Sequence, residues 1–207
     1  MKPQRILQEV REVLPPDAFI TTDVGWNKNG VGQQFPVLTP GTILTPGGFA
    51  TMGFGAPAAL GAKIAQPDRV VVSLVGDGGF GQNPSVLATA VEENIPVVWI
   101  VMNNSAFGTI AGLQMAHYET TYGTVFSEKV EKAIHPDFAA VARGYGMKGI
   151  KITSASEFKE ALAEAIASQE PCVIDVAMKN DPVPTDGHWN INDIYSPNSK
   201  RSHVSVN

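Results

Sequence analysis

The sequence predicts an α/β fold with a parallel sheet of about six strands and helices on both faces. Short β-branched segments alternate with helical segments of about ten to fifteen residues, as in βαβ units. Segments 70–75 and 95–102 are almost continuously apolar, which is typical of strands buried on both faces. We assign residues 1–180 to one domain and expect 181–207, rich in Asp, Asn, Pro and Ser, to be an irregular tail.

The first expected elements are a helix and a strand. Ile6, Val10 and Val13 recur at helical spacing, so residues 3–14 are expected to form an amphipathic helix. Residues 19–24 are rich in β-branched side chains and lie between turn residues, which predicts a strand.

A second helix is expected over 26–34, and a very short strand lies between the turn signals that flank 42–44. Residues 52–66 are also expected to be helical, although they include three glycines, each of which costs roughly 1 kcal/mol in a helix interior. Glycine there favours close approach of the backbone to a ligand or to another helix. The three are Gly53, Gly55 and Gly61.

The strand expected over 70–75 leads into a glycine-rich loop, 76–81. The pair Asn83-Pro84 is typical of a helix start, so a helix should run from there to about residue 93. The next strand is expected over 95–102.

The last third of the chain continues the alternation. Helices are expected near 107–116 and over 136–144, separated by a polar and irregular stretch. A Ser-x-x-Glu capping box at 154–157 predicts the start of a further helix. The last two strands are expected at 147–152 and 171–178.

Composition and charge exclude several classes of protein. The chain has 15 Lys and Arg against 20 Asp and Glu, a net charge of −5, which argues against non-specific binding to nucleic acid. The longest apolar run, 95–102, is far shorter than the about 20 residues of a membrane helix, so no membrane association is expected. Cys172 is the only cysteine, so neither an internal disulfide nor a thiolate metal cluster is expected. No signal-peptide pattern is visible, and we expect a cytoplasmic location.

The loop 76–81 is the first candidate site. Gly76, Gly78 and Gly81 satisfy G-x-G-x-x-G, the pattern of a dinucleotide-binding turn. Asp77 conflicts with that interpretation, because its carboxylate would lie against a pyrophosphate. The next acidic residues fall at a helix end, where they could not bind a ribose. The glycine pattern keeps a nicotinamide-binding oxidoreductase as an alternative hypothesis, but Asp77 and the missing ribose-binding carboxylate make it the less favoured one.

A divalent metal would resolve this conflict. Mg²⁺ prefers oxygen ligands and is commonly held by one or two protein groups together with substrate phosphates. Asp77 would supply the charged ligand, and the adjacent strand end would supply a neutral one from Asn103-Asn104. The glycines would let backbone N–H groups reach phosphate oxygens.

The order and spacing of these residues resemble a known motif. Gly76-Asp77-Gly78, followed by the 24 residues 79–102 and then Asn103-Asn104, resembles the thiamin-diphosphate motif of thiamin-dependent enzymes. The stretch 45–59 resembles the family sequence before that motif, particularly in acetolactate synthases, and Asp23-Val24-Gly25 is similar to the family's first diphosphate loop. The resemblance covers about residues 3–178 and implies the pyrophosphate-binding domain of the acetolactate synthase and 2-oxoacid decarboxylase group, with the thiamin-diphosphate-binding fold. Leu113 departs from the pattern, since biosynthetic acetolactate synthases have a tryptophan there.

The resemblance implies a site for thiamin diphosphate and Mg²⁺. The positions that match the metal ligands, the last through its backbone carbonyl, are Asp77, Asn104 and Ala106. Ala50 matches a residue whose carbonyl accepts a hydrogen bond from the cofactor's amino group, and Met52 matches the apolar residue that bends the cofactor. The other residues implied at the cofactor are Val24, Gly25, Trp26, Asn27, Gly76, Gly78, Gly79, Asn104, Phe107, Gly108, Thr109 and Ile110.

The implied activity is cleavage or formation of a carbon–carbon bond next to a carbonyl, in a 2-oxoacid or hydroxyacyl substrate. The enzyme would be a 2-oxoacid decarboxylase, an acetolactate-synthase-like carboligase or a 2-hydroxyacyl-CoA lyase. In this family a glutamate on another domain tautomerises the aminopyrimidine ring, and nothing in 1–207 matches it, so no catalytic residue is assigned to this chain. We therefore expect a glutamate-bearing partner chain or N-terminal domain, and a hetero-oligomer such as a dimer of heterodimers. A subunit that binds the cofactor without turnover is a further alternative.

Overall fold

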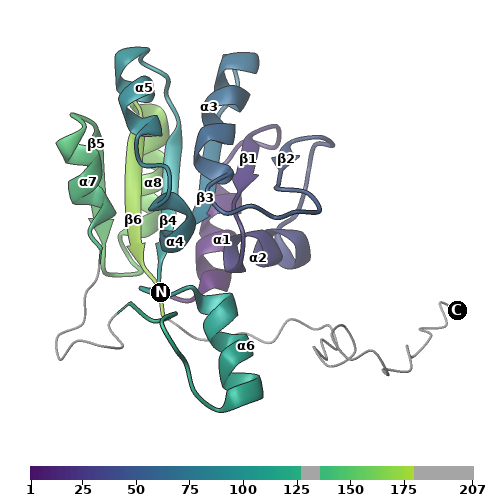
Figure 1. The fold of residues 1–207 in the computed structure, drawn as a ribbon. Coiled ribbons are helices and arrows are strands. Elements are labelled where there is room, and N and C mark those ends of the chain that lie inside the picture. Colours follow the sequence, from purple (N-terminus) through teal and green to yellow (C-terminus); the bar gives the residue numbers. More distant parts are fainter. Residues whose placement is uncertain (127–135, 180–207) are drawn as a thin grey trace, which may run out of the picture.

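The structure, a computed structural model, describes residues 1–126 and 136–179 and confirms the α/β class (Figure 1). Within these ranges, six strands form one sheet in the order β2-β1-β3-β4-β6-β5, and every pairing is parallel. The order reverses direction between β1 and β3, which makes the gap between their carboxyl ends a topological switch point. The strands are β1 (Phe19–Thr22), β2 (Ile43–Leu44), β3 (Val71–Gly76), β4 (Val98–Asn103), β5 (Lys148–Ile152) and β6 (Cys172–Ala177).

Helices cover both faces of the sheet, as expected. One face packs against α1 (Pro3–Val13), α2 (Trp26–Gln34) and α8 (Phe158–Ala167). The other packs against α3 (Gly55–Ala65), α5 (Val86–Glu92) and α7 (Phe138–Gly144). Two helices follow the carboxyl ends of β3 and β4, namely α4 (Asp77–Phe80) and α6 (Gly108–Tyr118). No helix in the described ranges combines the length and apolar character that a membrane span requires.

The alternation of side chains along β3 divides the core into two layers. Val72 and Leu74 belong to the layer under α1 and α8, whereas Val71 and Val75 belong to the layer under α3 and α5. All four side chains are at most 1% exposed. Burial on both faces explains why this segment is continuously apolar rather than alternating.

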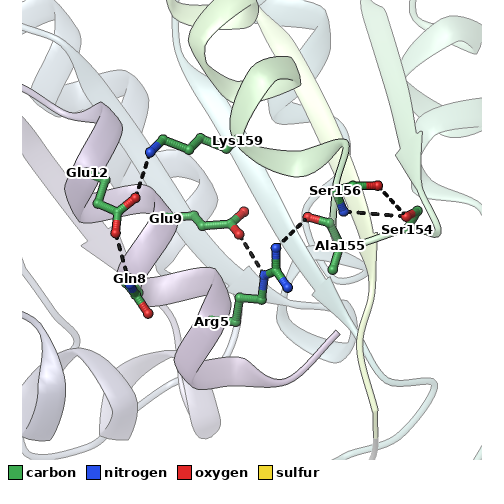
Figure 2. Close-up of polar contacts among 8 residues, drawn as sticks. All are labelled: Arg5, Gln8, Glu9, Glu12, Ser154, Ala155, Ser156 and Lys159. Atoms are coloured by element: carbon green, nitrogen blue, oxygen red, sulfur yellow. Dashed lines mark hydrogen bonds and ion pairs between the residues drawn. The ribbon is translucent and has the colours of Figure 1, made fainter.

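Polar contacts join α1 to α8 on the outside of the sheet (Figure 2). Lys159 Nζ lies 2.7 Å from Glu12 Oε2, and Arg5 donates to the carbonyl of Ala155 at 3.3 Å. The Lys159 and Glu12 side chains are 55% and 40% exposed, so water screens the pair and it adds little to the stability of the fold.

The capping box expected at 154–157 is wrong. Ser154 Oγ lies 2.8 Å from Ser156 Oγ, so the two hydroxyls form a local turn (Figure 2). The helix α8 begins at Phe158, and the side chain of its N-cap, Glu157, makes no capping hydrogen bond. The turn before the helix satisfies the serine hydroxyl that the capping box would have used.

Two other helix starts differ from expectation. The helix expected over 52–66 begins at Gly55, because Gly53, two residues earlier, adopts φ +90° and lies outside the helix. The helix expected from Asn83-Pro84 begins at Val86, because Asn83 Nδ2 donates to the carbonyl of Gly53 at 2.8 Å and does not cap the helix. The short helix α4 was not expected, and the proposed tail 181–207 lies outside the described residues.

Candidate functional site

A cavity of about 520 Å³ lies at the carboxyl ends of β3 and β4, beside the loop that follows β1. It brings together every residue that the sequence implied at the cofactor or the metal. These are Val24, Gly25, Trp26, Asn27, Ala50, Met52, Gly76, Asp77, Gly78, Gly79, Asn104, Ala106, Phe107, Gly108, Thr109 and Ile110. Six further residues also line it: Lys28, Asn29, Gln33, Met102, Leu113 and Met178.

The ladder between β3 and β4 explains why the glycine loop and the two asparagines meet. Gly76 pairs with Met102 in this parallel ladder, so both strands end at the same level of the sheet. Asp77 and Asn104 therefore start their loops side by side, and both line the cavity. The juxtaposition that the spacing predicted is present in the structure.

Asp77 is the buried acidic group of the cavity, with 3% of its surface exposed. Its Oδ1 accepts from the N–H of Gly78 at 2.8 Å, and its Oδ2 accepts from the N–H of Ala106 at 3.2 Å. Burial raises the pKa of Asp77 to about 6, although these backbone donors oppose the shift. Within the described ranges no cationic side chain pairs with Asp77, so a bound cation would stabilise its charged form.

Gly78 lies against two of the implied cofactor residues. A Cβ at this position would lie 2.5 Å from Phe107 Cε1 and 3.1 Å from Met52 Cε. Because glycine has no side chain, the backbone here can approach both neighbours while its N–H donates to Asp77 Oδ1. This close approach is the structural reason for glycine next to Asp77.

The N-terminus of α2 forms another wall of the cavity. Its N-cap is Gly25, at φ +100°, and no side chain caps this end of the helix. A helix N-terminus without a side-chain cap offers N–H donors and a partial positive charge to an anion such as a phosphate. This geometry fits the diphosphate contacts that the resemblance implied for residues 24–27.

Asn27 uses its side chain within the same loop. Its Oδ1 accepts from the N–H of Asp23 at 2.8 Å, and its Nδ2 donates to the carbonyl of Val24 at 3.2 Å. Asn27 is 2% exposed, although it lines the cavity. In this structure the Asn27 amide therefore fixes the backbone of the loop that follows β1.

Asp23 is a site residue whose role the sequence did not reveal. It has no exposed surface, and its carboxylate accepts from the N–H groups of Val24, Gly53 and Gly55 at 2.8–3.1 Å. These bonds tie the loop after β1 to the segment that presents Ala50 and Met52 to the cavity. The glycines at 53 and 55 were the visible signal, because both donate to this carboxylate.

Lys28 was also missed. Its Nζ donates to the carbonyl of Pro46 at 3.0 Å, so it links α2 to the segment before Ala50. Among the described residues that line the cavity, it is the one with a cationic side chain. The sequence signal for this lysine was its position, because it follows directly after residues 24–27, which the resemblance implied at the diphosphate.

Comparison with known proteins assigns the chain to a family. The C-terminal TPP binding domain of thiamine pyrophosphate enzymes matches residues 23–176. A probable acetolactate synthase large subunit from Methanocaldococcus jannaschii is 41% identical over 184 residues, 86% of this chain and 30% of that protein. A 3D-(3,5/4)-trihydroxycyclohexane-1,2-dione hydrolase from Bacillus cereus is 33% identical over 178 residues, 83% of this chain and 28% of that protein.

A solved structure of a thiamine diphosphate-dependent enzyme is also similar to this chain. The thiamine diphosphate-dependent 4-hydroxybenzoylformate decarboxylase from Rhodococcus jostii RHA1 superposes with a TM-score of 0.76 and 30% identity, over 87% of this chain and 33% of that one. This chain therefore spans between 28% and 33% of the length of the three relatives.

Proposed function

Because this chain belongs to the family of C-terminal TPP-binding domains of thiamine pyrophosphate enzymes, we propose that its cavity holds the diphosphate of thiamin diphosphate together with Mg²⁺. The domain would supply this half of the active site of an enzyme that cleaves or forms a carbon–carbon bond next to a carbonyl. Relatives named as a synthase, a hydrolase and a decarboxylase support this coarse class of reaction.

The single observation that supports the metal site best is the environment of Asp77. It is a buried carboxylate that lines the same cavity as Asn104 and Ala106, and burial holds its pKa near 6. Hard cations such as Mg²⁺ take oxygen ligands of these types and are commonly shared with a phosphate. Asp77, the Asn104 side chain and the Ala106 carbonyl would hold the ion, so the residues present fit this group.

The cavity is also shaped for the rest of the cofactor. Gly25 and the first turn of α2 would bind the diphosphate, together with the glycine backbone at 78–79. Ala50 adopts φ +48° and lies in a segment that Asp23 and Lys28 anchor through hydrogen bonds. The carbonyl of Ala50 would accept a hydrogen bond from the amino group of the cofactor. Met52 would bend the cofactor. When bound, thiamin diphosphate accepts the electron pair of the bond that breaks, and the protein positions it.

The substrate side of the cavity is apolar. Leu113 lines the cavity together with Met178, at a position where the resemblance implies a tryptophan in biosynthetic acetolactate synthases. These side chains would contact the substrate's carbon chain rather than its charged groups.

A general acid or base for the aminopyrimidine would have to come from elsewhere. Within the described residues, the charged side chains that line the cavity are Asp77 and Lys28, and the proposed role of Asp77 is to bind the metal. We propose that a glutamate on a partner chain or on a preceding domain completes the site, in a cytoplasmic hetero-oligomer or a longer polypeptide. The relatives' greater length is consistent with either arrangement.

The nicotinamide-binding alternative is less well supported. The glycine pattern at 76–81 does follow a strand, but its first residues form α4 with Asp77 buried at the start. A dinucleotide pyrophosphate placed there would face an uncompensated carboxylate.

The test is turnover with and without a glutamate-bearing partner. We expect the 207-residue chain alone to release little CO₂ or aldehyde from pyruvate, sulfopyruvate, benzoylformate or a 2-hydroxyacyl-CoA. Loss of general acid–base catalysis costs about 10²–10⁴-fold in rate. Adding the partner should restore turnover, and substitution of its glutamate should abolish it again. Rapid turnover by the chain alone would contradict the proposed division of the site.

A further inference from the structure

A third buried carboxylate, after those of Asp77 and Asp23, lies near the candidate metal site but outside the cavity. Asp175, in β6, is 1% exposed. Its Oδ1 accepts from Asn103 Nδ2 at 3.0 Å, and its Oδ2 accepts from the N–H of Phe138 at 2.9 Å. Each carboxylate oxygen therefore reaches a different segment near the site.

The first of these segments is the loop after β4. The side chain of Asn103 donates to the carbonyl of Pro136 at 2.8 Å, and its Oδ1 accepts from the N–H of Ser105 at 3.2 Å. Ser105 adopts φ +55°, a conformation that is strained for a non-glycine residue and persists only where its surroundings impose it. The next N–H, of Ala106, donates to Asp77. The loop conformation thus depends on the orientation of the Asn103 amide.

The second segment supports α4. The ring of Phe138 packs edge-to-face on the ring of Phe80, with the centroids 5.4 Å apart and the planes at 88°. Phe80 is the last residue of α4, and Asp77 is the first. By fixing the backbone of Phe138, Asp175 supports the helix that presents Asp77.

We propose that Asp175 is a positioning residue for the metal site. Through its bond to Asn103, Asp175 fixes the loop that presents the Asn104 side chain and the Ala106 carbonyl. Through its bond to the N–H of Phe138, it fixes α4. The proposed ligands come from the ends of two different strands, so their relative position has to be held by a group that contacts both segments. Groups behind the ligands commonly orient them in this way. The inference rests on the proposed function, which supplies the metal.

The first test measures metal affinity directly. Asp175→Asn keeps one acceptor oxygen but removes the second, and should raise the Kd of Mn²⁺ for the full chain, at saturating thiamin diphosphate, by about 10–100-fold. Asp137→Asn is the matched control, because Asp137 is a half-exposed carboxylate in the same region, whose Oδ1 accepts from the N–H of Ala140 at the start of α7. The control should bind Mn²⁺ as the wild type does. Affinities are compared where circular dichroism shows all three proteins folded.

The second test needs no metal. Hydrogen exchange of the Ser105 and Ala106 amides should accelerate in Asp175→Asn, while the amides of the distant helix α1 keep their wild-type rates. Asp175→Ser removes the same carboxylate with a smaller polar side chain and should accelerate the same two amides, which keeps the test decisive if Asp175→Asn fails to fold.

The outcomes separate the two hypotheses. Wild-type Mn²⁺ affinity and unchanged amide protection in Asp175→Asn would overturn the positioning role and leave the proposed function standing. If the wild type itself binds no Mn²⁺, the proposed function is overturned. The exchange rates of Ser105 and Ala106 then decide alone whether Asp175 fixes this loop.

Discussion

The Asp23 carboxylate occupies the space in which a side chain at residue 79 would lie. A Cβ built on Gly79 overlaps the Oδ1 atom of Asp23, and that oxygen is already bonded to the N–H of Val24 and of Gly53. Three segments, the loop after β1, the loop before α3 and the helix α4, therefore meet at one buried carboxylate. Because Asp23 cannot shift without breaking these bonds, the site tolerates no side chain at residue 79.

Gly79→Ala should therefore destabilise the chain. We expect the free energy of unfolding to fall by about 1–3 kcal/mol, the usual cost of overpacking a buried site. The measurement is urea unfolding followed by circular dichroism.

Gly61→Ala is the matched control for this prediction. Gly61 lies within α3, and a Cβ there would meet nothing within 4 Å. Alanine at an open helical position should raise the free energy of unfolding by about 0.5–1 kcal/mol. Equal effects of the two substitutions would show that the contact between Asp23 and residue 79 does not constrain the loops.

The pKa of Asp77 predicts a pH-dependent stability. Burial raises this pKa from 3.8 to about 6, so the folded chain disfavours the ionised form. Below about pH 4, Asp77 is protonated in both the folded and the unfolded chain, so its burial does not lower the free energy of unfolding. Above about pH 6, burial of the ionised carboxylate lowers the free energy of unfolding by about 3 kcal/mol, at about 1.4 kcal/mol per pKa unit.

The test compares the wild type with Asp77→Asn in the presence of a chelator. Asn removes the charge that is costly to bury, although it also replaces one of the two acceptor oxygens. Between pH 4 and pH 8 the unfolding free energy of the variant should therefore rise relative to that of the wild type, by up to about 3 kcal/mol. A difference in unfolding free energy that stays constant across this range would contradict the assigned burial of a charge.

Lys28→Met should weaken binding of thiamin diphosphate. The lysine is the cationic side chain at the cavity, and its Nζ anchors the carbonyl of Pro46. We expect the Kd to rise about tenfold, which corresponds to about 1.4 kcal/mol. Lys159→Met removes an exposed lysine paired with Glu12 on the outer face and should leave the Kd unchanged. An unchanged Kd in Lys28→Met would show that Lys28 does not contribute to binding of thiamin diphosphate.

The sequence predicted the strands and the set of cavity residues well, for a physical reason. Short, almost continuously apolar segments such as 70–75 are typical of buried strands in a parallel sheet, and ligands bind at the carboxyl ends of such strands. The resemblance then supplied the individual residues, and the structure brings these residues together in one cavity. What they bind remains a prediction that the experiments here address.

The features that could not be predicted depend on partners distant in sequence. The start of α3 at Gly55 follows from bonds to Asp23, 32 residues earlier, and the start of α5 follows from the bond between Asn83 and Gly53. The pairing of Asn103 with Asp175 spans 72 residues. Local periodicity contains no information about such contacts, so it placed the elements but not their ends.

The central claim is that Asp77 and a divalent ion together hold thiamin diphosphate in this cavity. Isothermal titration calorimetry of thiamin diphosphate into the wild type and into Asp77→Ala, each with Mg²⁺ and with EDTA, tests it most directly. We predict binding by the wild type only with Mg²⁺, and a large loss of affinity in Asp77→Ala. Equal affinity of the two proteins, or equal binding in EDTA, would contradict the claim.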